Sequence, residues 1–383
     1  MNDLQKRYSY NFPTLVRFGN GVIDELAAYL QNKGLKSPLL VTDPNVAELG
    51  FFKKINADLQ AAGLKTAVFF DMHKNPVESD VLAGKAAYNK AGADCIVGIG
   101  GGVAMDVARA IALSINHHRD LFDYDDLIGG DKYVTNEIPH LVTVPTTSGT
   151  GSEVGRSAII SENESKKKRI LFHPRLMASM VFADPTLTYD LPPFITAATG
   201  MDALTHNMEA YLAKGFSPLC DGIALEGIKL ITRSIVAATK EHNADARAEM
   251  MMGSLMGATA FQKGLGIVHS LAHPLSTLLD MHHGLANAIM IPYGMEFNIE
   301  GQEARFRDIA IAMGLHDHTG EAVCNALHAL NRELGMPAKL SGAGVEAIHV
   351  EQLSDLALAD FCHPNNPKPV TRADFKAIYL KAL

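Results

Sequence analysis

Histidine and aspartate residues with helical spacing lie in the second half of the 383-residue chain. Asp202 and His206 are four residues apart in a segment with a helical pattern, so their side chains leave the same helix face one turn apart. A carboxylate and an imidazole in this arrangement can hold one metal ion. For this helix taken alone, a polar stripe that faces solvent is the alternative explanation.

A second group of histidines favours the metal. His269 and His273 are four residues apart in an apolar helical segment, and His282 and His283 follow soon after. Imidazoles among apolar residues are costly to bury without partners, and one divalent ion could partner several of them. Nitrogen and oxygen ligands without a thiolate suit Fe²⁺ or Zn²⁺, which would act as a Lewis acid. The chain has no HExxH motif, so a zincin protease is not indicated.

Two loops of small residues could hold a nucleotide. The stretch GIGGGV at 98–103 follows an apolar run, and its glycines would let a helix N-terminus approach a pyrophosphate. It departs from the GxGxxG motif, because residue 103 is valine. A plain tight turn without a bound nucleotide is the alternative explanation for this stretch. The stretch TTSGTGSE at 146–153 is the second loop, where the alternative is a turn with a helix cap. Asp43, at the end of another apolar run, could accept hydrogen bonds from a ribose diol and would repel a 2′-phosphate, which favours NAD over NADP.

The elements that must position these residues differ between the two halves of the chain. In the first half, short apolar runs alternate with helical patterns, which predicts a mainly parallel sheet covered by helices. These runs are residues 39–42, 65–70, 94–99 and 140–144. From about Pro192 the segments are long and helical. We therefore predict an α/β N-terminal Rossmann-like nucleotide-binding domain (residues 1–191) plus an all-α C-terminal metal-binding domain (192–383), with the site in the cleft between them.

Composition excludes several classes of function. The net charge is -8 and basic residues are not clustered, which argues against a nucleic-acid partner. No apolar run is long enough to span a membrane, and the N-terminal segment is polar, so we expect a cytoplasmic protein. The four cysteines form no CxxC pair, which disfavours a disulfide framework or a cysteine zinc site. There is also no P-loop and no GxSxG motif.

Five stretches together resemble the iron-containing (group III) alcohol dehydrogenase family: GIGGGVAMDVAR, PTTSGTGSEV, ATGMDALTHNMEAY, GIVHSLAHPL and HHGLANAI. The resemblance covers nearly the whole chain. It implies the dehydroquinate synthase-like fold and the NAD-linked, metal-dependent interconversion of a primary alcohol and its aldehyde. The implied metal ligands are Asp202, His206, His269 and His283, which would hold Fe²⁺ or Zn²⁺. His273 is implied as a proton relay near the nicotinamide.

The resemblance also implies where the cofactor is held. The expected contacts are Asp43, Asn75, Gly101, Gly102, Thr146, Thr147, Thr150 and Lys168. Two positions depart from the family pattern, since Val103 replaces the usual serine and Arg109 the frequent lysine. We expect these changes to alter cofactor affinity without removing the site. A homodimer or higher homo-oligomer is expected, because closed symmetric assemblies are the common default.

One arginine suggests a narrower substrate class. Arg156 in GTGSEVGRSAII, together with FQKGLG and FCHPNNPK, resembles the 4-hydroxybutyrate dehydrogenase branch. Its guanidinium could bind a substrate carboxylate through two hydrogen bonds, and an ordinary structural ion pair is the alternative. His173 and Lys368 are weaker candidates for the same role.

Three rival functions remain open at this point. The first is an NAD-using, metal-dependent lyase or cyclase of the dehydroquinate synthase type. The second is a metallohydrolase without a nucleotide, and the third is a non-catalytic assembly protein. The HSLAHPL and HHG stretches fit the dehydrogenases better than the first rival, and the complete ligand set argues against the third.

Overall fold

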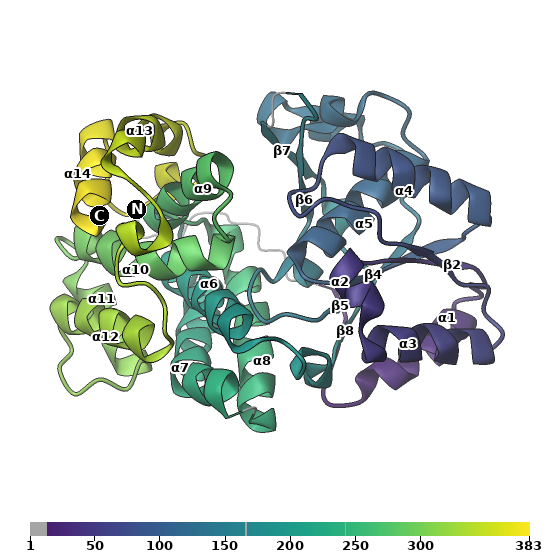
Figure 1. Cartoon of the computed structure of the whole chain (residues 1–383), viewed down its shortest axis with the longest axis horizontal. Coiled ribbons are helices and arrows are strands. Elements are labelled where there is room, and N and C mark those ends of the chain that lie inside the picture. The colour runs from purple at the N-terminus through teal and green to yellow at the C-terminus, as the bar shows by residue number, and fades with distance from the viewer. Residues whose placement is uncertain (1–13, 165–166, 242) are drawn as a thin grey trace. The chain divides into compact units, whose positions relative to one another are not determined.

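The computed structural model describes residues 14–164, 167–241 and 243–383 (Figure 1). Their contacts form two compact units. The α/β unit contains residues 14–147 and 151–188, and the helical unit contains residues 189–383 together with 148–150. The sequence does not anticipate that the short segment 148–150 belongs with the helices. The predicted domain boundary between residues 191 and 192 stays a prediction.

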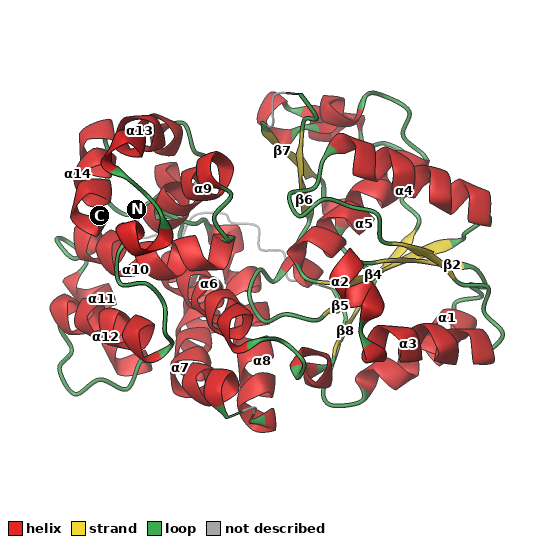
Figure 2. Ribbon diagram, viewed as in Figure 1, coloured by secondary structure: helices red, strands yellow, loops and turns green. Residues whose placement is uncertain are grey.

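A six-stranded parallel sheet forms the centre of the α/β unit, with strand order β1-β8-β5-β4-β2-β3 (Figure 2). Its strands are β1 (Val16–Phe18), β2 (Pro38–Val41), β3 (Ala67–Phe69), β4 (Cys95–Gly100), β5 (His140–Pro145) and β8 (Met180–Ala183). A separate antiparallel hairpin consists of β6 (Ser157–Ser161) and β7 (Lys168–Phe172). The Rossmann-like expectation is confirmed.

Helices cover both faces of this sheet, because alternate residues of each strand point to opposite sides. The helices of the unit are α1 (Leu26–Asn32), α2 (Pro44–Glu48), α3 (Gly50–Ala61), α4 (Glu78–Ala91) and α5 (Gly102–Ile115). Leu39 and Val41 of β2 join the core formed with α4 and α5, whereas Leu40 joins the core formed with α1 and α3. The continuous apolar run of β2 therefore reflects burial on both sides.

Nine helices form the helical unit among its described residues. They are α6 (Pro193–Leu212), α7 (Pro218–Lys240), α8 (Ala244–Ala260), α9 (Ile267–Leu279), α10 (His283–Asn298), α11 (Glu303–Ala312), α12 (Gly320–Glu333), α13 (Val350–Leu358) and α14 (Arg372–Ala382). Helix α6 is buried along most of its length and contacts α7, α8 and α10 (Figure 1). A helix enclosed in this way brings polar side chains into the interior, where they need partners. The expected all-α architecture is confirmed.

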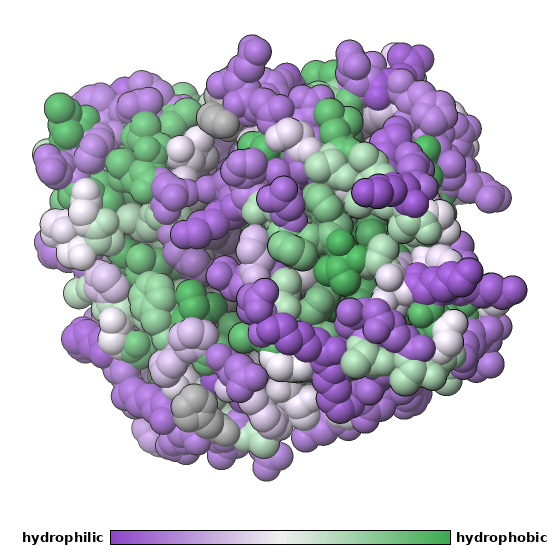
Figure 3. Space-filling view, turned by 45° about the vertical axis from the view of Figure 1, so that its right-hand side comes forward, coloured by the Kyte–Doolittle hydropathy of each residue, from purple (hydrophilic) through white to green (hydrophobic). Residues whose placement is uncertain are grey.

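On the face drawn in Figure 3, hydrophilic side chains are interspersed with hydrophobic ones. None of the helices in the described part of the chain is both long and apolar enough to cross a membrane.

Candidate metal and cofactor site

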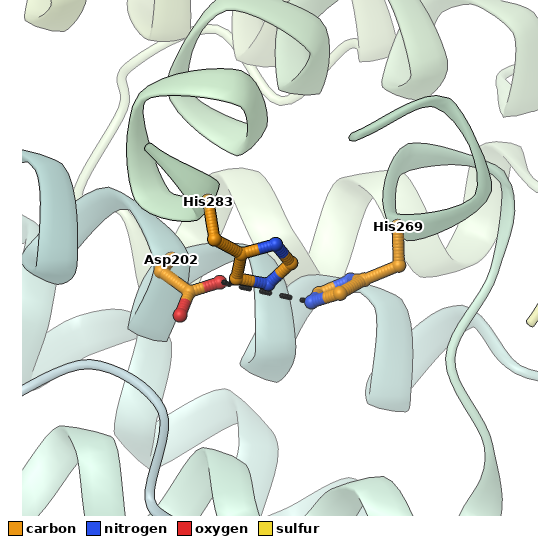
Figure 4. A group of neighbouring side chains, drawn as sticks. All are labelled: Asp202, His269 and His283. Carbon is orange, nitrogen blue, oxygen red and sulfur yellow. Dashed lines mark ion pairs between the residues drawn. The ribbon is translucent and has the colours of Figure 1, made fainter. Parts of the chain in front are cut away.

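Three of the predicted metal ligands converge in the helical unit. Asp202 lies in α6, His269 lies in α9, and His283 is the first residue of α10. Figure 4 shows their side chains pointing toward one another. Oδ1 of Asp202 is 3.5 Å from Nε2 of His283 and 3.7 Å from Nε2 of His269, and one ligand atom from each residue lies within 4.8 Å of the others. Two ligands of one tetrahedral ion lie about 3.4 Å apart, so this spacing suits a shared ion.

The fourth predicted ligand, His206, follows Asp202 by one turn of α6. Its Nε2 is 3.9 Å from Oδ1 of Asp202, and the ring is buried. His206 does not belong to the tighter group of three mutually close ligand atoms. The structure thus brings the three predicted histidine ligands around one carboxylate oxygen of Asp202, with His206 the most distant. His282, also considered in the sequence, is exposed and lies against Phe194.

The hydrogen bonds of two ligand histidines decide which nitrogen faces the centre. Nδ1 of His269 is 2.6 Å from a carboxylate oxygen of Glu209, and Nδ1 of His206 is 3.3 Å from the carbonyl oxygen of Gly149. Because both partners can only accept, each Nδ1 carries a proton, and in the neutral rings each Nε2 presents a lone pair toward Asp202. Lone pairs and a carboxylate oxygen repel one another unless a cation lies between them. The donor set therefore fits a divalent ion.

The charges of the buried groups support the same conclusion. Burial alone would raise the pKa of Asp202, but the neighbouring histidines outweigh burial and hold this pKa far below its usual range. Burial lowers the pKa of His206 to about 4. For His269, the attraction of the Asp202 carboxylate and the hydrogen bond to Glu209 outweigh burial and raise the pKa to about 9. The two carboxylates thus require a positive charge at this centre, either a proton or a metal ion.

Asn287 also lies at the centre, one turn after His283 in α10. Its Nδ2 is 2.7 Å from Oδ1 of Asp202 and 3.2 Å from Nε2 of His283. Its Oδ1 is buried and has no hydrogen-bond partner among the described residues. An unpaired buried oxygen is costly, and here it adds a further oxygen beside the predicted ligands. The HHGLANAI stretch contains Asn287, but its type alone did not single it out.

The glycine loop and Asp43 lie together at the carboxyl end of the parallel sheet. Helix α5 begins at Gly102, and its N-cap residue Gly101 has no side chain to accept from the first amides of the helix. Gly100 adopts a φ of +149°, which side chains rarely tolerate. Oδ1 of Asp43 caps α2 by accepting from Asn45 and Val46, whereas Oδ2 lies 3.5 Å from the position a Cβ would occupy on Gly100. This arrangement fits a dinucleotide phosphate at the helix N-terminus with a ribose beside Asp43.

The other predicted cofactor contacts fall into three places. The amide of Thr146 donates to the Gly100 carbonyl at 3.0 Å, and Thr147 lies beside Gly101. Asn75 precedes Pro76, whose carbonyl accepts from Ser161, and Ser161 pairs with Lys168 across the β6–β7 hairpin. Asn75 and Lys168 therefore lie near one end of that hairpin. Thr150 belongs by its contacts to the helical unit.

Comparison with known proteins matches both halves of the chain. Residues 13–185 match "Iron-containing alcohol dehydrogenase", and residues 196–383 match "Fe-containing alcohol dehydrogenase family, C-terminal". The chain belongs to the iron-containing alcohol dehydrogenase family. It is therefore an enzyme that interconverts alcohols and carbonyl compounds, and the lyase, metallohydrolase and non-catalytic alternatives are disfavoured.

Individual relatives of this alcohol dehydrogenase act on different substrates. The chain is 39% identical to a 4-hydroxybutyrate dehydrogenase of Cupriavidus necator, over 95% of this chain and 96% of the relative. It is 36% identical to alcohol dehydrogenase 4 of Saccharomyces cerevisiae, over 97% and 98%. A crystal structure of 1,3-propanediol oxidoreductase superposes with a TM-score of 0.95 at 34% identity, covering 99% of this chain and 100% of that one. A sulfoacetaldehyde reductase of Bifidobacterium kashiwanohense in complex with NAD⁺ gives 0.88 at 27% identity, covering 98% and 99%.

The histidine predicted as a relay in this dehydrogenase has a partly buried carboxylate partner. Nδ1 of His273 is 2.7 Å from Oδ2 of Asp360, and its ring stacks on that of His283 with centroids 5.3 Å apart. Asp360 is 87 residues away in sequence, and no sequence pattern pointed to it. The bond between Glu209 and His269 was likewise not predicted.

The predicted carboxylate-binding residue has no acidic partner among the residues that the structure describes. Arg156 is half-buried, with its guanidinium 5.4 Å from the centre of the Phe172 ring. Burial alone lowers its pKa, and among the described residues no carboxylate forms an ion pair with it. The structural ion pair that the sequence left as an alternative is therefore not found. By contrast, Lys368 pairs with Glu300 at 2.7 Å, and His173 accepts from the amide of Arg175.

The two departures from the family pattern occupy different environments. Val103 packs against the core that α4 and α5 share. Arg109 is fully buried and donates to the Ser157 and Ser152 carbonyls at 2.6 Å each and to the Leu176 carbonyl at 3.0 Å. Arg109 thus ties α5 to the segment that follows the second loop. An altered cofactor affinity stays a prediction for both positions.

Proposed function

We propose that this iron-containing alcohol dehydrogenase uses NAD to interconvert a primary alcohol that carries a distal carboxylate, of the 4-hydroxybutyrate type, and the matching aldehyde. We infer the substrate class from Arg156, a half-buried guanidinium that no described carboxylate neutralises. Desolvating a cation is costly unless an anion joins it, so this position favours an anionic ligand. The relative named 4-hydroxybutyrate dehydrogenase, at 39% identity, supports this choice.

We propose that Asp202, His206, His269 and His283 hold the metal, with iron favoured and zinc as the alternative. Iron is the metal in the family name, and both ions accept imidazole and carboxylate ligands. The proposed cofactor residues of the α/β unit hold NAD rather than NADP, because the carboxylate of Asp43 would repel a 2′-phosphate. A relative crystallised with NAD⁺ supports this cofactor.

We assign to His273 the role of accepting the proton that the alcohol releases. Oxidation removes one hydride and one proton from the carbinol; the bound NAD supplies the hydride acceptor and the bound ion polarises the substrate oxygen. The role of the chain is then to orient the substrate and to accept the proton. Nε2 of His273 is suited to this, because its Nδ1 is already engaged by Asp360. In the reductive direction the same nitrogen returns the proton.

Substrate pairs of equal chain length test the role of Arg156. We expect Arg156→Ala to lower kcat/KM for 4-hydroxybutyrate about 100-fold, since a charged hydrogen bond contributes about 2–3 kcal/mol, and to leave 1-butanol nearly unchanged. Arg17→Ala removes an exposed arginine paired with Glu25 and serves as the control. Equal losses for both alcohols would contradict the carboxylate role. A raised KM for NAD in Arg156→Ala would instead assign the guanidinium to a cofactor phosphate.

We also propose a cytoplasmic homo-oligomer. The four cysteines are buried and unpaired, as is usual in a reducing compartment. Symmetric assemblies are common among enzymes of this size. Light scattering on the purified enzyme gives the number of subunits, and cell fractionation gives the compartment.

A further inference from the structure

Helix α9 carries two imidazoles that are held in the same way by two different carboxylates. Nδ1 of His269 is 2.6 Å from Glu209, and Nδ1 of His273 is 2.7 Å from Asp360. The two histidines are four residues apart, so both lie on one face of the helix. Glu209 comes from α6, whereas Asp360 lies in the segment after α13. The bond between Glu209 and His269 orients a proposed metal ligand. The bond between Asp360 and His273 requires a different explanation, because His273 is not a proposed ligand.

The carboxylate of Asp360 is partly buried, and both of its oxygens have donors. Oδ1 accepts from the hydroxyl of Ser270 at 2.6 Å and from the backbone amide of Cys362 at 2.9 Å. Oδ2 accepts from Nδ1 of His273. The His273 ring also contacts the rings of His283 and Phe361, with centroids 5.3 and 5.6 Å away. Hydrogen bonds and ring contacts thus fix both the position and the rotation of this imidazole.

We propose that Asp360 is a positioning residue for His273: it keeps the proton on Nδ1 and thereby makes Nε2 the nitrogen that accepts the proton of the alcohol. An ionised carboxylate can only accept hydrogen bonds, so the ring nitrogen facing it must be the donor. The proposal rests on the proposed function in one respect, the assignment of the alcohol proton to His273. Asp360 itself need not touch the substrate.

A second metal ion is the competing explanation for this cluster. His273, Asp360 and Cys362 each place one ligand atom within 4.8 Å of the others. However, the carboxylate already has three hydrogen-bond donors, and burial raises the pKa of the Cys362 thiol, which disfavours a thiolate ligand. A hydrogen-bonded pair of Asp360 and His273 therefore explains more of the observed contacts than a second metal ion does.

The variant Asp360→Asn tests the proposal with little change in shape. The backbone amide of Cys362 can only donate, so the asparagine oxygen should stay on that side and its NH₂ group should face Nδ1 of His273. Nδ1 must then accept, and the ring proton moves to Nε2, where it blocks proton transfer from the alcohol. We expect kcat to fall about 100-fold or more, while the KM for NAD, the KM for the alcohol and the bound metal stay unchanged.

The matched control is Asp355→Asn on α13, which removes the carboxylate from an exposed ion pair with Arg372 of α14. It should leave kcat unchanged. Asp360→Glu keeps the carboxylate and should recover part of the lost kcat. An unchanged kcat in Asp360→Asn, or an equal loss in both asparagine variants, would overturn the proposal.

A spectroscopic measurement tests the proposal without turnover. Long-range ¹H–¹⁵N spectra of the zinc-loaded enzyme with NAD report which ring nitrogen carries the proton, and His273→Gln identifies the signal. We expect the proton on Nδ1 in the wild type and on Nε2 in Asp360→Asn. A wild-type ring protonated on Nε2 alone would refute the proposal even if every variant failed to fold. Failure of the wild type to form NADH from any alcohol would instead refute the proposed function.

Discussion

Single hydrogen bonds decide much of the chemistry of this enzyme at the residue scale. Glu209 links α6, where it lies, to α9. One of its oxygens accepts from the amide of Val268 at 2.6 Å and the other from the ring of His269 at 2.6 Å. It therefore caps the first turn of α9 and also directs Nε2 of His269 toward Asp202. Such carboxylate partners of metal-binding histidines commonly affect metal affinity as much as they affect stability.

Glu209→Gln should weaken metal binding about 10- to 100-fold. Glutamine has only one accepting oxygen, so either the amide of Val268 or the ring of His269 loses its acceptor. The dissociation constant can be measured by competition with a coloured chelator, independently of turnover. Glu226→Gln, at an exposed position of α7 beside Lys229, is the control. An affinity equal to that of the wild type would show that Glu209 only supports the fold.

At the scale of elements, close approach between helices brings the ligands together. A Cβ on Gly284 would lie 2.3 Å from the Ala198 carbonyl oxygen of α6, and a Cβ on Gly149 would lie 2.7 Å from the Thr199 side chain. These glycines let α10 and the 148–150 segment approach α6, which carries Asp202 and His206. The glycines of HHG and GTG therefore have a packing role that the sequence alone did not reveal.

Gly284→Ala should destabilise the helical unit by about 1–3 kcal/mol, because the added methyl group meets backbone that cannot move freely. Metal affinity should fall as well, since α10 carries His283. Gly222→Ala is the control, because that glycine is exposed in α7 and nothing lies within 4 Å of the added carbon. It should instead stabilise by about 0.5–1 kcal/mol. Urea unfolding followed by circular dichroism measures both, and equal effects of the two variants would disprove this packing role.

The elements themselves were only partly predictable. The apolar runs at 39–42, 65–70, 94–99 and 140–144 correspond to β2, β3, β4 and β5. Strands β1 and β8, which pair with each other along one side of the sheet, were not predicted. The β6–β7 hairpin and α13 were also missed. Long periodic helices such as α6 and α7 were easier to predict, because their pattern repeats over several turns.

At the scale of the whole molecule, one buried acid links stability to pH. Glu153 is buried in the α/β unit, where burial raises its pKa to about 7, well above its usual value of 4.5. Below pH 4.5 the residue is protonated in both the folded and unfolded states and has no effect. Between pH 4.5 and 7 the unfolded chain loses this proton first, so stability falls as the pH rises. Above pH 7 the full cost of the buried charge is present.

Glu153→Gln should remove this dependence. Relative to the wild type, the variant should gain little stability at pH 4.5 and most at pH 8, since each pH unit between the two pKa values changes the unfolding free energy by about 1.4 kcal/mol. Thermal unfolding from pH 4.5 to 8 measures the difference. Glu137→Gln, at an exposed position, is the control and should follow the wild type. A constant difference between Glu153→Gln and wild type across this range would exclude titration of Glu153.

The sequence by itself was sufficient for features that depend on neighbouring residues. Asp202 and His206 share a helix face because four residues make about one turn, and a glycine loop after a strand opens a helix N-terminus wherever it folds. Contacts between distant segments required the tertiary structure. Packing of α10 against α6 turns His283 toward the centre and leaves His282 exposed, although the two are adjacent in sequence. The partnership of His273 with Asp360 likewise depends on which surfaces meet, as does the lack of an acidic partner for Arg156 in the described part of the chain. Helical spacing carries no information about such contacts.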